Sequence, residues 1–80
     1  MKAQILNLKG QLYEGEAKLV NAQTQSGEIT ILPGHQPIIS VLSENSRIYL
    51  DDEKGQRHEY ETKGGFLHLD AGNNLRVLID

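Results

Sequence analysis

The sequence has no cysteine and no tryptophan, and only 5% of its residues are aromatic. Without cysteine the chain can form neither disulfides nor thiolate metal sites, so a reducing, intracellular environment fits best. The scarcity of aromatic residues argues against a deep ligand pocket and therefore against a cofactor enzyme. At 80 residues the chain has room for one domain, residues 1–80, with a thin core.

An excess of positive charge is also missing. The net charge is −3 with acids and bases interspersed, whereas a nucleic-acid binder needs a basic stripe that displaces counterions from phosphates. No apolar run approaches the ~18 residues of a membrane-spanning helix, and residues 1–4 lack the apolar stretch of a signal peptide. We therefore expect a soluble chain that binds no nucleic acid and does not enter a membrane by itself.

What the sequence does contain is alternation of apolar and polar residues in short segments. No window keeps an apolar stripe at helical spacing for three turns, so we expect no substantial helix. Turn residues, among them Gly10 and Gly15, recur roughly every 8–12 positions, a spacing typical of a β-sandwich or barrel. The pattern predicts an all-β fold whose strands bury these sets: Gln4, Leu6 and Leu8; Ala17 and Leu19; Ile29 and Ile31; Ile48 and Leu50; Phe66 and His68; Leu75, Val77 and Ile79.

Residues 38–42 depart from this alternation. Ile38, Ile39, Val41 and Leu42 are apolar, and Ser40 is the one polar residue among them. Both faces of such a strand require cover, whereas one face of a half-buried strand is normally polar. We expect one of its faces to meet a partner.

The segment before this strand predicts a tight turn. Pro33 presets φ near −65° at the second turn position, and Gly34 supplies a positive φ at the third, which gives a type II turn. Taken alone, His35 is interpreted as a surface histidine next to that turn. The pair Gly64–Gly65 indicates a bulge or a close backbone approach, because it lacks the spacing of a phosphate-binding loop.

No other constellation points to catalysis or metal binding. The three histidines are far apart in sequence, so a zinc site would need the fold to bring them together. The acidic residues 51–53 lack the spaced oxygen ligands of a calcium loop and are interpreted as a solvated hairpin end. No Gly-x-Ser-x-Gly elbow or positioned base is present. We expect no catalytic residue, no metal and no cofactor.

Four segments together resemble the epsilon subunit of F-type ATP synthases: 12–16, 27–40, 64–67 and 77–80. Their order and intervals match, and the run from Gly27 to Pro37 is the most specific part. The resemblance implies a flattened two-sheet β-sandwich of about ten short strands. It also implies a non-catalytic subunit of the central stalk, placed between the gamma subunit and the membrane-embedded c-ring and turning with the rotor.

The resemblance carries residue roles with it. Glu28 matches an acidic position that faces the c-ring loops, and His35 and Ser40 match positions that face gamma. Asn7 joins them on a looser alignment, and Pro33–Gly34 only shape the turn. An interface strand at 38–42 would account for its two apolar faces.

The sequence also departs from the family. Asn45 and Ser46 stand where many members have a glycine, which asparagine can replace because it tolerates the left-handed region. His68 stands where an acid is common.

Most members continue into a two-helix hairpin that can inhibit the catalytic head and in some cases binds ATP, whereas this sequence stops at Asp80. We expect a subunit that couples gamma to the ring without inhibiting by that route and without binding ATP, on the cytoplasmic side of a bacterial inner membrane. A free-standing β-sandwich that binds a peptide or small ligand along an exposed edge remains the alternative.

Overall fold

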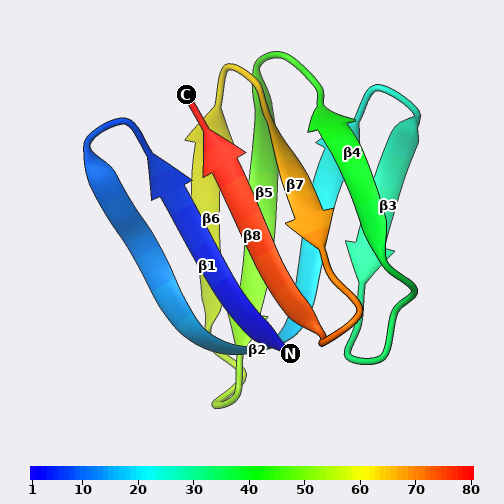
Figure 1. Cartoon of the computed structure of the whole chain (residues 1–80). Coiled ribbons are helices and arrows are strands. Elements are labelled where there is room, and N and C mark those ends of the chain that lie inside the picture. Colours follow the sequence, from blue (N-terminus) through cyan, green and yellow to red (C-terminus); the bar gives the residue numbers. More distant parts are fainter.

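The computed structural model describes residues 1–80 and contains eight β-strands and no helix (Figure 1). Because it has no helix, no helical segment could cross a membrane. The all-β prediction is confirmed, but the strands are eight rather than about ten. Their bounds are β1 (Lys2–Asn7), β2 (Gly10–Thr24), β3 (Gly27–Ile31), β4 (Ile38–Leu42), β5 (Ser46–Asp52), β6 (Arg57–Thr62), β7 (Gly65–Leu69) and β8 (Asn74–Ile79).

The strands form two layers of a sandwich that are joined at one side by the bend of β2 and at the other by the pairing of Thr24, at the end of β2, with Leu42 of β4. The first layer contains the initial half of β2, then β1, β8, β7 and β4, with β1 and β8 parallel and the other pairs antiparallel. The second layer contains β6, β5, the final half of β2, and β3. Figure 1 shows β2 descending beside β1, turning at the bottom of the view and rising again behind β8 and β7.

The bend in β2 explains why the strand count is lower than expected. Glu16 pairs with β1 in the first layer, whereas the next residue, Ala17, pairs with Asp52 of β5 in the second. Gly15, interpreted as a turn between two strands, instead lies inside this 15-residue strand with a φ of 155°. The Tyr13 hydroxyl donates to the Glu16 carbonyl oxygen at 2.8 Å across the bend. One continuous strand therefore serves both layers.

The core lies between the layers and is aliphatic. It comprises Met1, Ala3, Ile5, Ala17, Val20, Ala22, Ile31, Leu42, Ile48, Leu50, Leu67, Leu69, Leu75, Val77 and Ile79. Burial of each large aliphatic side chain is worth about 1.5–3 kcal/mol before the loss of conformational entropy is subtracted. The predicted inward sets of β5 and β8 are confirmed, and Ile31 of β3 is fully buried.

Two predicted inward sets are wrong. On β1 the buried residues are Ala3 and Ile5, whereas Leu8 is 98% exposed in the hairpin turn after the strand. On β7 the buried residues are Leu67 and Leu69, so Phe66 and His68 point outward. Both segments have apolar residues at odd and even positions, so alternation alone does not decide which face is buried.

A third inward set is half right, because β2 carries an irregularity. Ala17 is buried, but Leu19 is only half-buried and Val20 is fully buried instead. The register between β2 and β5 shifts between Ala17 and Leu19. A bulge adds one residue to one strand of a pair, so it reverses which alternate residues face the core.

The glycine pair at 64–65 is a site of close backbone approach, as predicted. A Cβ on Gly65 would collide with the carbonyl oxygen of Leu78 on β8 and lie 3.0 Å from the Ile79 Cα. Gly65 also has a φ of 135°, which L side chains rarely adopt. Glycine at position 65 therefore allows β7 to pair closely with β8 from its first residue, where Gly65 is opposite Ile79.

Candidate interaction surfaces

A row of apolar side chains crosses the outer face of the first layer. Leu6, Leu78, Phe66 and Val41 are register partners from one strand to the next, across β1, β8, β7 and β4. Phe66 is 48% exposed, Val41 50% and Leu78 37%, and Leu6 is half-buried. We call these four residues the apolar row.

The apolar row is not part of the core, because the alternate residues of the same strands already fill it. Ile5, Val77 and Leu67 point inward and are fully or almost fully buried. Ile39, next to Val41 on the same face of β4, is 72% exposed. The row and Ile39 thus form a contiguous exposed apolar surface, the kind that marks a contact site. The chain itself thus leaves one face of 38–42 uncovered, and contact of that face with a partner stays a prediction.

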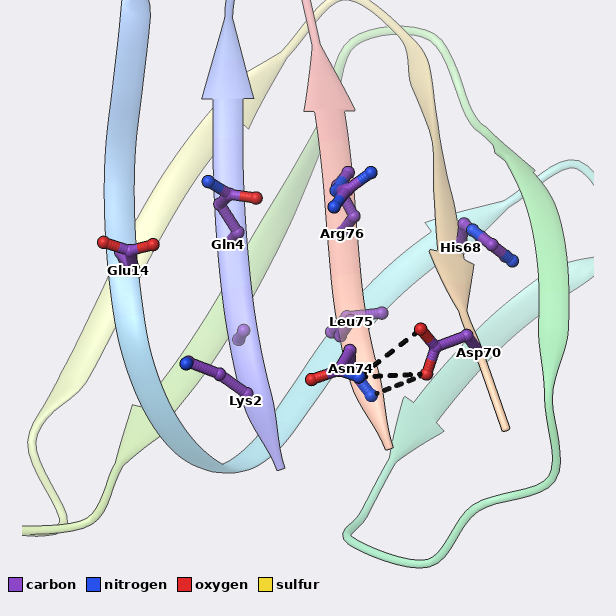
Figure 2. Close-up of a pocket in the computed structure, with 9 residues that line it drawn as sticks. Lys2, Gln4, Glu14, His68, Asp70, Asn74, Leu75 and Arg76 are labelled. Atoms are coloured by element: carbon purple, nitrogen blue, oxygen red, sulfur yellow. Dashed lines mark hydrogen bonds between the residues drawn. The ribbon is translucent and has the colours of Figure 1, made fainter. Parts of the chain in front are cut away.

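A polar groove of ≈ 270 Å³ adjoins the apolar row on the same face. Figure 2 shows Gln4, Arg76 and His68 at one level across β1, β8 and β7, one step along the strands from the row. Glu14 lies at the β2 side of the groove, and Asp70 lies at its lower end (Figure 2). The outer face is therefore apolar toward one end and polar toward the other.

Asp70 is fully engaged by the β7–β8 turn. Its Oδ1 accepts hydrogen bonds from the backbone N–H groups of Gly72 at 2.8 Å and Asn74 at 3.0 Å, and the Asn74 side-chain amide lies within reach of both carboxylate oxygens. The backbone donor of Asn74, followed by that of Gly72, lowers the pKa of Asp70 below its ordinary value of 3.8. The carboxylate of Asp70 therefore stabilises the β7–β8 turn by accepting hydrogen bonds from it.

The lowered pKa of Asp70 makes a testable contribution to stability. Because the folded-state pKa lies below 3.8, the contribution is complete above that pH and is lost as the pH falls through the folded-state value. The free energy of unfolding of Asp70→Asn should be lower than that of the parent at pH 7 and close to it at pH 2, measured by urea denaturation. The exposed Glu53, which makes no hydrogen bond, provides the control Glu53→Gln. An equal difference at both pH values would contradict this role.

Glu28 lies on the outer face of the second layer. Its carboxylate accepts hydrogen bonds from the side-chain amides of Asn21 at 3.2 Å and Gln23 at 3.4 Å, both on β2. Glu28 itself is exposed. The side chain is thus held by neutral amides and keeps its negative charge available to an outside contact.

The Pro33–Gly34 turn forms as predicted. The His35 N–H donates to the Leu32 carbonyl oxygen at 3.0 Å, and Gly34 has a φ of 87°. The Gly34 N–H donates to Asn73 Oδ1 at 3.3 Å, which ties this turn to the β7–β8 turn. His35 is half-buried, and its Nδ1 lies 2.6 Å from the Gln36 carbonyl oxygen.

The three residues predicted to face one partner do not lie together. β4 and β1 run in the same direction, so His35, which precedes β4, and Asn7, which ends β1, lie at opposite ends of the first layer. Asn7 Oδ1 accepts from the N–H groups of Lys9 and Gly10 and so shapes the β1–β2 turn. Ser40 is half-buried on the inner face, opposite Leu67.

The histidines do not form a metal site. No three His, Asp or Glu side chains are gathered in a way that could hold an ion. His58 instead pairs with Asp52 at 3.0 Å and packs against Tyr13, with 5.2 Å between ring centroids. Hydrogen bonding from His58, followed by the backbone of Gln56, lowers the pKa of Asp52. Asp52 Oδ1 also accepts from the Lys54 and Gln56 N–H groups, so the acidic segment shapes a hairpin turn.

Sequence reasoning missed the outward residues of β1, β7 and β8. Phe66 and Leu6 were expected in the core, and Leu78 and Arg76 were not singled out. The signal that could have found Leu78 was present, because Leu75, Val77 and Ile79 were correctly predicted to point inward and the residue between two of them must point outward. For Phe66 the competing alternation of Leu67 and Leu69 was the available signal.

Comparison with known proteins gives a consistent result. The model of the family described as the β-sandwich domain of ATP synthase delta/epsilon chains matches residues 1–80. The ATP synthase epsilon chain of Corynebacterium aurimucosum is 35% identical over 78 residues, which cover 98% of this chain and 63% of that protein. The epsilon chain of Rhodococcus erythropolis is 37% identical over 71 residues, covering 89% and 58%. The chain thus spans about three-fifths of the length of these curated relatives.

Solved structures share the fold at low sequence identity. A chain of the Euglena gracilis mitochondrial ATP synthase superposes with a TM-score of 0.87 at 19% identity, over 96% of this chain and 48% of that one. A chain of the Tetrahymena thermophila mitochondrial ATP synthase, in a structure of the central stalk and c-ring, gives a TM-score of 0.82 at 13% identity, over 99% and 62%.

Proposed function

Because this chain belongs to the family of β-sandwich domains of ATP synthase delta/epsilon chains, we propose that residues 1–80 form one domain of an epsilon subunit that couples the gamma subunit to the c-ring. In this role the domain does no chemistry. It transmits rotation during ATP synthesis driven by an ion gradient, so what it needs is two firm contacts rather than a catalytic site.

The apolar row is the observation that supports this proposal most strongly. It lies on the first layer, whereas the exposed acidic side chain Glu28 lies on the second. Two contact surfaces on different layers suit a subunit held between two partners. A standard interface takes about 800 Å² from each protein, which is a modest part of the 4968 Å² surface of this chain.

We assign gamma to the outer face of the first layer. A partner that covers the apolar row would reach Asn7, which follows Leu6 on β1. His35 precedes the other end of β4, so the same partner would reach it only by extending along the face past the polar groove. Ser40 would not meet this partner directly, because its side chain lies on the inner face of β4. Glu28 is proposed to contact the polar loops of the c-ring.

The proposal places the chain at the membrane surface only through the complex, on the cytoplasmic side of a bacterial inner membrane. It is limited to residues 1–80, to which we assign assembly and coupling, with no inhibition, ATP binding or cofactor.

Binding to each partner tests the proposal directly. The 80-residue chain should co-elute in size-exclusion chromatography with a complex of alpha, beta and gamma subunits depleted of epsilon. It should separately bind detergent-solubilised c-ring. Glu28→Lys should weaken the ring contact by at least about tenfold, because it replaces the carboxylate proposed to contact the c-ring loops with a positive charge. It should leave the gamma contact unchanged.

The control Glu59→Lys reverses an exposed charge on β6 and should change neither contact. Failure to co-elute with the gamma-containing complex at micromolar concentration would leave the chain without its proposed role. In that case a free-standing binding module becomes the better explanation.

A further inference from the structure

Arg76 has no electrostatic partner within the chain. Its guanidinium makes neither a hydrogen bond nor an ion pair, in contrast to Arg47 and Arg57, which pair with Glu61 and Asp51. It is exposed on the outer face of β8, with His68 as its register partner on β7 and Gln4 on β1 (Figure 2). No carboxylate stands directly opposite Arg76 on either neighbouring strand.

The acids nearest to the groove cannot easily supply that partner. Asp70 is occupied by the N–H groups of its own turn. Glu16 forms an ion pair with the terminal ammonium group of Met1 at 3.1 Å. Glu14 lies on β2, with β1 and Gln4 between it and Arg76. The chain therefore leaves the arginine charge without a matching anion.

Arg76 lies beside the apolar row on the same face of the sheet, so a partner that binds the row also affects this charge. Arg76 is two residues from Leu78 on the same face of β8, and His68 is two residues from Phe66 on the same face of β7. A protein that covers the apolar row would also cover Arg76 and remove much of its water. Removing water from a guanidinium that has no partner costs free energy, so we expect such a protein to supply an anionic hydrogen-bond acceptor for it.

We propose that the gamma surface that covers the apolar row carries a carboxylate side chain that enters the polar groove and binds Arg76. This inference rests on the proposed function and adds the chemistry of the partner: an apolar centre flanked on one side by an acidic residue. A carboxylate suits the site because a guanidinium can bind it through two parallel hydrogen bonds, and a groove of ≈ 270 Å³ has room for one such side chain.

The pairing would also give specificity. A gamma surface with a basic residue at this point would place two like charges together in a poorly hydrated contact, which disfavours the wrong partner more than the pair favours the right one. The apolar row would supply affinity, and Arg76 would select the partner and fix its register.

The experiment compares three variants of Arg76 in isothermal titration against the epsilon-depleted complex of alpha, beta and gamma subunits. Arg76→Gln should raise Kd roughly 10- to 100-fold, and Arg76→Glu should raise it further. Arg76→Lys should fall between the parent and Arg76→Gln, because it keeps the charge but not the two-pronged geometry. Lysine substitution of gamma's acidic residues, one at a time, should identify one that restores binding of Arg76→Glu.

Arg47→Gln is the matched control, since it removes an exposed arginine of the second layer, and it should bind as the parent does. The three Arg76 variants should keep the parent's melting temperature to within a few degrees, because Arg76 makes no bond within the fold.

Three outcomes would overturn the inference. If Arg76→Gln binds within twofold of the parent while a substitution in the apolar row weakens binding, the row is an interface but no carboxylate meets Arg76. If Arg76→Glu binds more tightly, the partner is basic at this point. If neither Arg76 nor the row affects binding, the proposed gamma surface itself is wrong.

Discussion

Phe66→Asp should reduce the affinity of the chain for the gamma-containing complex at least about 100-fold while the domain stays folded. Phe66 is the largest side chain of the apolar row, stands in its middle between Val41 and Leu78, and is 48% exposed in the free chain. Aromatic residues near the centre of an interface contribute disproportionately to affinity. A carboxylate at the same point would be buried without a partner when the complex forms.

The fold should tolerate this change because the Phe66 side chain lies outside the core. The core residues of β7 are Leu67 and Leu69. Circular dichroism and the melting temperature measure folding, and titration calorimetry measures Kd. Lys18→Asp, which introduces the same side chain at an exposed position of the second layer, is the control and should bind normally. Unchanged affinity in a folded Phe66→Asp variant would remove the apolar row from the interface.

Gly65→Ala should destabilise the domain by about 2–5 kcal/mol, combining roughly 1–3 kcal/mol of overpacking with about 1–2 kcal/mol of backbone strain. The added Cβ would collide with the Leu78 carbonyl oxygen, which belongs to the neighbouring strand and cannot turn away as a flexible side chain could. It would also hold an alanine at a φ of 135°. The chain could absorb the collision only by separating β7 from β8.

This loss would be large relative to the total. A domain of 80 residues has a free energy of unfolding of roughly 4–12 kcal/mol, so we expect the melting temperature to fall by roughly 15–30 °C. Gly64→Ala is the internal control, because a Cβ on Gly64 would meet nothing within 4 Å and only its φ of 151° would be strained. We expect about 1 kcal/mol there. Equal losses in the two variants would mean that backbone conformation, and not the collision, makes glycine necessary.

The two changes separate the two roles of β7. Its inner face and its first residue hold the sandwich together, whereas its outer face presents Phe66 to solvent. Gly65→Ala should therefore lower stability much more than Phe66→Asp does, and Phe66→Asp should reduce binding without unfolding. The melting temperatures and gamma titrations of the two variants would measure this difference.

Local chemistry in the sequence was enough for the fold class and for most turns. Alternation predicted strands, and the Pro33–Gly34 pair predicted a turn that the structure forms with its expected hydrogen bond. Asn45 was expected to take the left-handed conformation in place of a glycine, and it has a φ of 51°. The Gly64–Gly65 pair was expected to allow a close backbone approach. Each of these features depends on residues close together in the chain, so it can be predicted from a short stretch of sequence.

The candidate site depended on information that the sequence distributes over several strands. For β1 and β7 both alternations contained apolar residues, and only pairing with β2, β4 and β8 decided which one faced the core. The sequence therefore placed Phe66 and Leu6 inside, although they form part of the exposed row. The absence of a carboxylate opposite Arg76 likewise follows from register, which no single segment specifies.

By itself, then, the sequence determined an all-β chain, its turns, its lack of crosslinks and its resemblance to a family, because these follow from composition, local backbone preference and short motifs. It also showed that residues 38–42 had more apolar surface than one core could cover. Only the tertiary structure decided which side chains join across β1, β8, β7 and β4 to make one surface, and that Glu28 faces outward from the other layer. A sheet face is assembled from residues that hydrogen bonding aligns across strands, and that alignment is a property of the whole fold.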